Sequence, residues 1–375
     1  MLKLGVKALS TRITEENIVE FVVRAVNSKL QEFFKEIDEE VVREAPRARD
    51  LVTISRDYTL RGGKRLRAVL ALIGYWSKEW RSGSIEAITD VMAAIELLQS
   101  YLLIHDDVMD QDELRRGGPT VHIVFRRKCA ENKWRNCEHY GVSQAIVAGD
   151  MLEASAVGLL SSKLLEPRVV RDLMLAYSRG LRRVAYGQYL DVMFSQLSIS
   201  EVREEDIVSI YNFKTSSYTV ELPLHLGSIA SGKSNSKLLS ELSSYAMPAG
   251  IAFQIRDDII GLFGDPSVTG KPAGSDVKSK KKTLLIVKAY ELARYKDKEL
   301  IELVYDKLSE SEITDKHVEE IRRIVKESGS LNYAEELINK YVHYALDAVE
   351  SSKEICEEAK ETLKWLTSKL AFREK

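Results

Sequence analysis

The sequence predicts an all-α protein that folds as a single domain over residues 1–375. Apolar residues recur at three- and four-residue spacings along most of the chain, and no alternating strand pattern of useful length is present. The composition supports this class, because 45% of the residues are hydrophobic, 30% are charged and only 7 are proline. The net charge of −2 provides no global basic field, which argues against nucleic acid as a partner.

The first expected helix covers 15–45, and Pro46 is a stop signal just beyond it. Its apolar face is formed by Ile18, Phe21, Val22, Val26, Leu30, Phe33 and Phe34. Further helices are expected at about 65–80, 84–110, 142–165, 167–196, 216–231, 237–263 and 283–294, and the pattern continues to about 371. The turn sequences RGG, RRGGPT and GDPSVTGKPAGS separate the helices, and none of them is typical of a flexible interdomain linker.

A polar stretch at 126–140, RRKCAENKWRNCEHY, breaks the helical pattern and is interpreted as an insertion on the surface. It holds Cys129 and Cys137, with His139 close by. The three cysteines of the chain do not make a disulfide framework, and the spacing of these residues matches no standard zinc pattern. We favour the surface insertion over a zinc site.

The N-terminal sequence MLKLGVKALSTRITEEN lacks the apolar run of a signal peptide. The longest uninterrupted apolar stretches, such as AVLALIGYW, are far shorter than the roughly 18 residues that a membrane span needs. We therefore expect a cytoplasmic protein without a transmembrane segment.

One apolar helix is expected to end in a cluster of carboxylates. In LLIHDDVMDQDELRRGGPTVH, residues 102–122, the apolar run leads into Asp106, Asp107 and Asp110. Residues three and four apart share a helix face, so these carboxylates crowd together and repel one another unless a cation is present. The negative end of the helix macrodipole adds to the repulsion. The alternative interpretation is a solvated helix end.

The stretch FQIRDDIIGLFGD, residues 253–265, repeats this arrangement with Asp257 and Asp258, and Asp265 follows them. Magnesium typically takes one or two protein carboxylates and fills its other positions with water and phosphate oxygens. Two such helices facing each other would hold several Mg²⁺ ions and clamp a diphosphate. Acidic clusters at the ends of apolar helices thus favour a ligand with an anionic head and an apolar tail.

Basic residues indicate a second anion site. RGGKRLR, residues 61–67, is expected to open a helix, where Gly63 lets an anion approach the backbone and Lys64 and Arg67 point the same way. Further basic residues flank the two acidic clusters: Arg115 and Arg116, Lys271, and KSKKK at 278–282. A solvated loop remains the interpretation for at least two of the four lysines in KSKKK.

These motifs together resemble those of the trans-isoprenyl diphosphate synthases, most closely the archaeal geranylgeranyl diphosphate synthases. The matching motifs, in that family's order, are GGKRLR, LLIHDDVMDQDELRRGGPTVH, AGDMLEA, GQYLD, FKT and FQIRDDIIGLFGDPSVTGKPAGSD, from about residue 50 to about residue 290. The resemblance implies the isoprenoid synthase fold, a single large helical bundle around a central cavity. It also implies Mg²⁺-dependent condensation of isopentenyl diphosphate with dimethylallyl, geranyl or farnesyl diphosphate, by ionisation, condensation and elimination.

The resemblance assigns a role to each site residue. The metal ligands would be Asp106, Asp107, Asp110, Asp257 and Asp258. The isopentenyl diphosphate site would comprise Gly63, Lys64, Arg67, Gln99 and Arg116. The allylic diphosphate would contact Arg115, Lys214, Thr215, Gln254, Lys271 and Lys281, and Gln188 and Asp191 in GQYLD would line the reaction centre. The residues closest to the chemistry would be Lys214, Thr215, Gln254, Asp106 and Asp110, and no nucleophilic side chain is needed.

Two positions depart from the family pattern. Gln99 stands where the family often has a histidine, seven residues before Asp106, and an amide can donate a similar hydrogen bond. Gly261 stands where many members have a third aspartate, and Asp265 is an untested substitute.

Product length is expected to depend on the helix before the first acidic cluster. At 1.5 Å per residue, Tyr101 lies roughly 7–8 Å below Asp106, beside Leu98 and Leu102, and is bulky enough to form the floor of the cavity. An ordinary core tyrosine is the alternative interpretation. The resemblance favours a twenty-carbon product, with a farnesyl or longer product as the nearest alternative.

Two other classes of protein share parts of this pattern. A class I terpene cyclase has one DDxxD sequence but needs no GGKRLR and normally lacks a second aspartate pair. A non-catalytic subunit of a heteromeric synthase tends to lose the aspartates. By analogy with the family we expect a homodimer.

Overall fold

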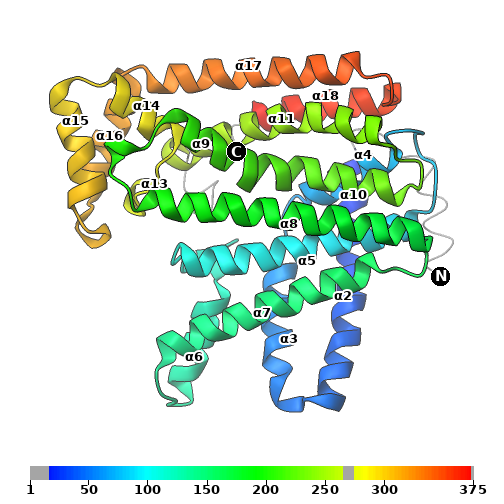
Figure 1. Cartoon of the computed structure of the whole chain (residues 1–375). Coiled ribbons are helices and arrows are strands. Elements are labelled where there is room, and N and C mark those ends of the chain that lie inside the picture. The colour runs from blue at the N-terminus through cyan, green and yellow to red at the C-terminus, as the bar shows by residue number, and fades with distance from the viewer. Residues whose placement is uncertain (1–16, 265–273, 373–375) are drawn as a thin grey trace. The chain divides into compact units, whose positions relative to one another are not determined.

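The computed structural model describes residues 17–264 and 274–372, and almost all of their regular structure is helical (Figure 1). The all-α prediction is confirmed. The strands in these two ranges are β1 (Leu114–Arg115) and β2 (Gly118–Pro119), which pair antiparallel across the turn of the RRGGPT sequence.

The chain forms two compact units, the first of which contains residues up to 176 and 223–234. Its helices are α2 (Ile18–Glu44), α3 (Arg49–Leu60), α4 (Leu66–Trp76), α5 (Ile85–Met109), α6 (Val121–Glu131) and α7 (Cys137–Leu160), with a 3-10 turn, η2 (Pro46–Ala48). The first part of α8 (Pro167–Ser195) and all but the first residue of α10 (Leu222–Ala230) also belong to it. Within this unit α5 packs against α4 and α7, and α6 packs against α7.

The second unit contains residues 177–222 and those from 235 onward. Its α-helices are the rest of α8, α9 (Glu204–Ile210), α11 (Ser236–Phe263), α13 (Ser275–Lys278), α14 (Leu284–Leu292), α15 (Tyr295–Glu302), α16 (Asp315–Glu327), α17 (Ser330–Ser351) and α18 (Glu357–Ala371). Its other helical segments are the π-helices η4 (Tyr211–Glu221) and η5 (Leu303–Lys307) and the 3-10 turns η3 (Ile199–Glu201) and η6 (Glu310–Glu312). Helices α17 and α18 pack along α11 (Figure 1).

The predicted apolar face of the first helix is buried. Six of its seven residues are at most 8% exposed, and Phe21 is half-buried. Helix α2 ends at Glu44, just before Pro46, as the stop signal predicts. The sequence pattern therefore identifies this element and its end correctly.

Helix α5 carries the first acidic cluster and is the most apolar long helix. Ser84 caps its first turn by accepting a hydrogen bond from the Ala87 backbone at 3.3 Å. Among the described helices it alone is long and apolar enough to cross a membrane, but 78% of its most apolar window is buried within the protein. This burial is typical of a core helix.

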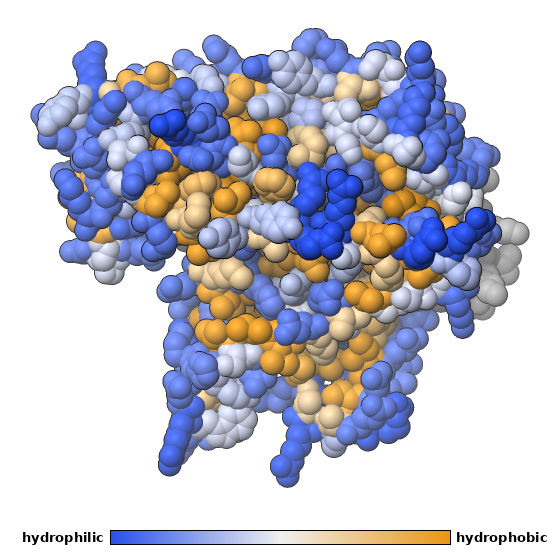
Figure 2. All heavy atoms as spheres, viewed as in Figure 1, coloured by the Kyte–Doolittle hydropathy of each residue, from blue (hydrophilic) through white to orange (hydrophobic). Residues whose placement is uncertain are grey.

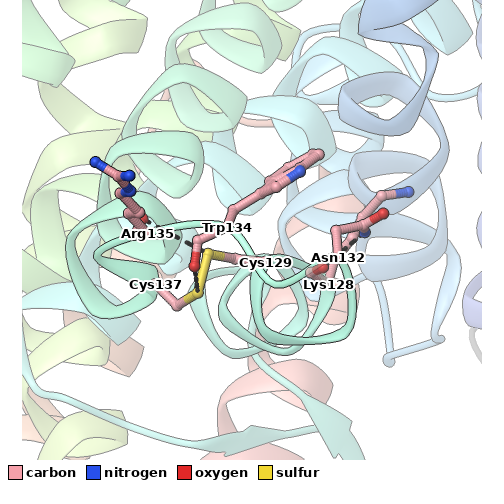
Figure 3. Close-up of a disulfide and its surroundings, with 6 residues drawn as sticks. All are labelled: Lys128, Cys129, Asn132, Trp134, Arg135 and Cys137. Atoms are coloured by element: carbon pink, nitrogen blue, oxygen red, sulfur yellow. Dashed lines mark hydrogen bonds between the residues drawn. A yellow bond between two sulfur atoms is a disulfide. The ribbon is translucent and has the colours of Figure 1, made fainter.

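The sequence suggested that the segment 126–140 is aperiodic, but much of it is helical. Most of its residues are exposed, as expected for a surface segment. Residues 126–131 form the end of α6 and residues 137–140 the start of α7. A disulfide between Cys129 and Cys137 joins the two helices across the turn that holds Trp134 and Arg135 (Figure 3). The expectation that the three cysteines make no disulfide framework is therefore wrong for Cys129 and Cys137, and as a disulfide they offer no thiolates to zinc.

Candidate active site

The first acidic cluster divides into two kinds of carboxylate. Asp106 and Asp110 lie one helical turn apart, with Asp106 partly exposed and Asp110 exposed. Asp107 is completely buried and accepts a hydrogen bond from the Tyr58 hydroxyl of α3 at 2.6 Å. The sequence suggested that the three carboxylates crowd together on one helix face, but they do not share one exposed face.

Arg115 holds the buried carboxylate from its other side. Its Nε donates to Asp107 Oδ1, and its Nη2 lies 3.0 Å from Asp112 and 3.6 Å from Asp106. Burial raises the pKa of Asp107 to about 6, although the charge of Arg115 opposes that shift. Arg115, predicted to contact a diphosphate, is thus bound within the acidic cluster of the protein itself.

The predicted isopentenyl diphosphate residues are partly brought together. Arg116, at φ +51°, donates to the Gly62 carbonyl oxygen at 2.7 Å and places its guanidinium against Gly63. Lys64 is exposed and Arg67 half-buried at the start of α4, and Gln99 is buried on α5. The turn after the first acidic cluster therefore meets the glycine-rich loop before α4.

The second aspartate pair repeats the division of the first. On α11, Asp257 is partly exposed, whereas Asp258 is 4% exposed. Asp258 accepts a hydrogen bond from the Tyr211 hydroxyl and another from Gln254 Nε2 at 2.8 Å. Burial raises its pKa to about 7, against the effect of the Tyr211 hydrogen bond and of the charge on Lys281.

Lys214 and Thr215 lie on the π-helix η4, between α8 and α11. Gly187 of α8 and Gly250 of α11 let the η4 backbone approach closely, because a Cβ at either position would clash with Lys214 or Ser216. Such π-helical turns are frequent at functional sites. The Thr215 hydroxyl reaches Gln254 Oε1 at 2.7 Å.

The GQYLD residues lie on α8, where the sequence places them. Asp191 Oδ2 accepts a hydrogen bond from Lys214 Nζ at 2.6 Å, and both side chains are mostly buried. Gln188 lies one turn earlier on the same helix and is half-buried. The prediction that this helix serves the same site as the FKT sequence is consistent with the Lys214–Asp191 ion pair.

The space beside Gly261 is occupied by a side chain from another part of the sequence. A Cβ at Gly261 would lie 2.5 Å from Oδ2 of Asp276, so the carboxylate of Asp276 occupies the space of the missing side chain. Asp276 was not among the predicted site residues. The suggested substitute Asp265 and the predicted ligand Lys271 lie outside the described residues.

The predicted chain-length residues lie on α5. Leu98 is 1% exposed, and Tyr101 and Leu102 are half-buried. The Tyr101 ring packs edge-on against His105, with 4.8 Å between ring centroids, and His105 Nε2 lies 3.1 Å from the Ile146 carbonyl oxygen. His105 was not among the predicted residues, because its contacts depend on α7.

In each unit, the aspartates that are at least partly exposed have the chemistry of magnesium ligands. Asp106 and Asp110 in the first unit, and Asp257 in the second, offer hard oxygen donors. In residues 17–264 and 274–372, no group of three or more His, Cys, Asp or Glu side chains is close enough together to hold a metal ion. With one or two carboxylates each, the two donor sets fit ions that take most of their ligands from water and a bound diphosphate.

The polyprenyl synthetase family model matches residues 49–324. This chain belongs to the polyprenyl synthetase family. A geranylfarnesyl diphosphate synthase from Aeropyrum pernix is 33% identical over 84% of this chain and 91% of its own length. A geranylgeranyl diphosphate synthase from Sulfolobus acidocaldarius is 32% identical over 77% and 80%.

A solved structure supports the same polyprenyl synthetase assignment. It is that of geranylgeranyl pyrophosphate synthase from Corynebacterium glutamicum, complexed with isoprenyl diphosphate and magnesium. It is 30% identical with a TM-score of 0.87 and covers 96% of this chain and all of that chain. This polyprenyl synthetase is therefore a prenyltransferase with the isoprenoid synthase fold.

Proposed function

We propose that the protein condenses isopentenyl diphosphate with allylic diphosphates to give geranylgeranyl diphosphate. The observation that carries the proposal is the match to geranylgeranyl diphosphate synthases along most of their length, at about one residue in three. Because the relatives also include geranylfarnesyl and farnesyl diphosphate synthases at similar identity, overall similarity does not fix the product.

We assign the Mg²⁺ ligands to Asp106, Asp110 and Asp257. When bound, the metal neutralises the negative charge that develops on the departing diphosphate. Asp107 and Asp258 face buried donors and orient them. This assignment narrows the prediction of five metal-binding aspartates to the three that are at least partly exposed, and leaves out the two that are buried.

The basic residues divide between the two substrates. Lys64, Arg67 and Arg116 surround the glycine-rich loop before α4 and suit the diphosphate of isopentenyl diphosphate. Lys281 acts electrostatically on Asp258 and suits the allylic diphosphate. Arg115 and Lys271 are further proposed contacts of that group.

Lys214, Thr215 and Gln254 are proposed to face the reacting carbons. The backbone carbonyl oxygen of Lys214 and the side-chain oxygens of Thr215 and Gln254 stabilise the allylic cation as it forms, and the double bond of isopentenyl diphosphate attacks it. The proton lost in the final step goes to the released diphosphate. Asp191 holds the Lys214 ammonium in place at 2.6 Å, and Gln188 lies on the same helix.

Tyr101 is the proposed floor for the growing chain. Its ring is fixed from one side by His105, and Leu98 and Leu102 are its apolar neighbours on α5. A floor at this depth favours a twenty-carbon product.

We also propose that the protein acts as a cytoplasmic homodimer. Helix α7 exposes the large apolar side chains of Ile146 and Val147, at 44% and 47%. Figure 2 shows hydrophobic side chains at the surface over the region that α7 occupies in Figure 1. A second copy packing on α7 would cover them. A cytoplasmic location suits substrates whose charged diphosphates do not cross membranes unaided.

The test is a magnesium-dependent assay with isopentenyl diphosphate and each allylic primer, followed by product chromatography. A twenty-carbon diphosphate is expected. Diphosphate release without an elongated product would indicate a terpene cyclase, and no turnover of the protein alone would indicate a non-catalytic subunit.

A further inference from the structure

Four hydrogen bonds in the second unit connect the start of α14 to Thr215. The Leu284 backbone N–H donates to the Tyr211 hydroxyl at 3.0 Å, and that hydroxyl donates to Asp258 Oδ2. Gln254 Nε2 donates to Asp258 Oδ1 at 2.8 Å, and the Thr215 hydroxyl donates to Gln254 Oε1 at 2.7 Å. This series of hydrogen bonds thus begins at a backbone amide and ends at a hydroxyl on η4.

The direction of each bond follows from the chemistry of its members. A backbone N–H only donates, and a carboxylate only accepts. The Tyr211 hydroxyl therefore accepts from Leu284 and donates to Asp258. Because the carboxylate also needs a donor from Gln254, the amide nitrogen faces Asp258 and the amide oxygen faces Thr215.

Thr215 must then use its one hydroxyl proton on Gln254. The two oxygen lone pairs of Thr215 are left on the other side of that oxygen. Burial fixes this state, because Tyr211, Asp258 and Thr215 are 5%, 4% and 8% exposed and water has little access to compete.

We propose that Tyr211 is a positioning residue that, through Asp258 and Gln254, presents the lone pairs of Thr215 rather than its proton to the reacting carbons. The inference rests on the proposed prenyl transfer, in which an allylic cation forms beside Thr215. An electron-rich oxygen stabilises that cation, whereas a hydroxyl proton turned toward it would repel it. Because the orientation is set before substrate binds, the reaction step needs no reorientation of the hydroxyl.

The first experiment compares two tyrosine substitutions in the full-length protein at pH 8. Tyr211→Phe removes the hydroxyl and should lower kcat by about 10- to 50-fold, while KM for both diphosphates stays within about twofold. Tyr245→Phe is the matched control, because Tyr245 is also buried and its hydroxyl lies 2.9 Å from Thr367 Oγ1 and 3.2 Å from the Leu363 carbonyl oxygen. The control should keep the kcat of the unsubstituted protein.

The second experiment tests whether Tyr211 acts through Thr215. Thr215→Ser keeps the hydroxyl and should retain most of the activity, and Thr215→Val should lower kcat by at least as much as Tyr211→Phe while leaving a measurable rate. The double variant of Tyr211→Phe with Thr215→Val should be no slower than Thr215→Val alone, because both changes remove the same oriented oxygen. Losses that multiply would show a structural role for Tyr211 and overturn the inference.

Asp258→Asn replaces Tyr211→Phe in both experiments if the tyrosine variant does not fold. Its amide can donate to Gln254 and so removes the fixed direction, and the same kcat loss and the same non-additivity are expected. If the unsubstituted protein forms product and the Tyr211 or Asp258 variant keeps its full kcat, this inference alone is overturned. No product from the unsubstituted protein would overturn the proposed function and this inference with it.

Discussion

Asp107→Asn should destabilise the protein without raising its Mg²⁺ requirement. Asp107 is completely buried between the Tyr58 hydroxyl, at 2.6 Å, and the Arg115 guanidinium. Breaking a buried ion pair by removing one partner costs about 3–5 kcal/mol. Two features lessen the cost here: asparagine keeps an oxygen for Tyr58, and Arg115 keeps Asp112 at 3.0 Å. We therefore expect a loss of about 2 kcal/mol in the free energy of unfolding.

Asp110→Asn is the matched control on the same helix. Asp110 is exposed, so its substitution should change the free energy of unfolding by less than about 0.5 kcal/mol. It should instead raise the Mg²⁺ concentration needed for half-maximal activity, because a proposed metal ligand is lost. Urea unfolding followed by circular dichroism and Mg²⁺ titration of prenyl transfer measure the two effects. The reasoning from burial is refuted if Asp107→Asn raises the Mg²⁺ requirement and leaves unfolding unchanged.

Four further outcomes are expected. Tyr101→Ala should lengthen the product by one or more five-carbon units on chromatography, and an unchanged product would remove Tyr101 as the floor. Gly261→Ala should displace the Asp276 carboxylate and lower kcat several-fold; activity equal to that of the unsubstituted protein would show that Asp276 has no role there. Cys137→Ser opens a disulfide between cysteines 8 positions apart and should lower the free energy of unfolding by about 2–3 kcal/mol with kcat unchanged, as urea unfolding will show. In metal-free protein, Asp258 keeps its proton up to a pKa of about 7, whereas the unfolded chain releases that proton near pH 4. Its contribution to stability therefore falls as pH rises through this window, so Asp258→Asn should gain stability relative to the unsubstituted protein at pH 8 but not at pH 5.

The helices that the sequence revealed are long, and most of their buried residues are apolar. Helix α2 is one of them, with buried residues spaced four apart along most of its length. Helix α3 was missed because it is short and polar overall, and its buried face includes Ser55 and Thr59 beside Val52 and Tyr58. The start of α7 was missed for a related reason: its first residues are polar, and only the disulfide and the packing on α6 show that the helix begins there.

The sequence predicted the charged residues of the candidate site but not their partners. Both aspartate pairs and Lys214–Thr215 follow from local patterns and from resemblance to a family. Tyr58 and Tyr211 did not, because they lie 49 and 47 residues from the aspartates that they contact. Tyr211 also lies in a π-helix, whose spacing differs from the 3.6-residue period by which helical faces are recognised.

The two aspartate pairs share one arrangement, although they lie in different units. In each pair the first aspartate is partly exposed, and the second is buried against a tyrosine hydroxyl, from Tyr58 in one unit and Tyr211 in the other. Successive residues on a helix point about 100° apart, so an adjacent pair can direct one carboxylate outward and the other inward. The inner carboxylate then fixes a second donor, which is Arg115 in the first unit and Gln254 in the second. Under the proposed function, a single aspartate would serve either the metal or an internal donor. An adjacent pair would serve both, and so would link metal binding to the groups held in place beside it.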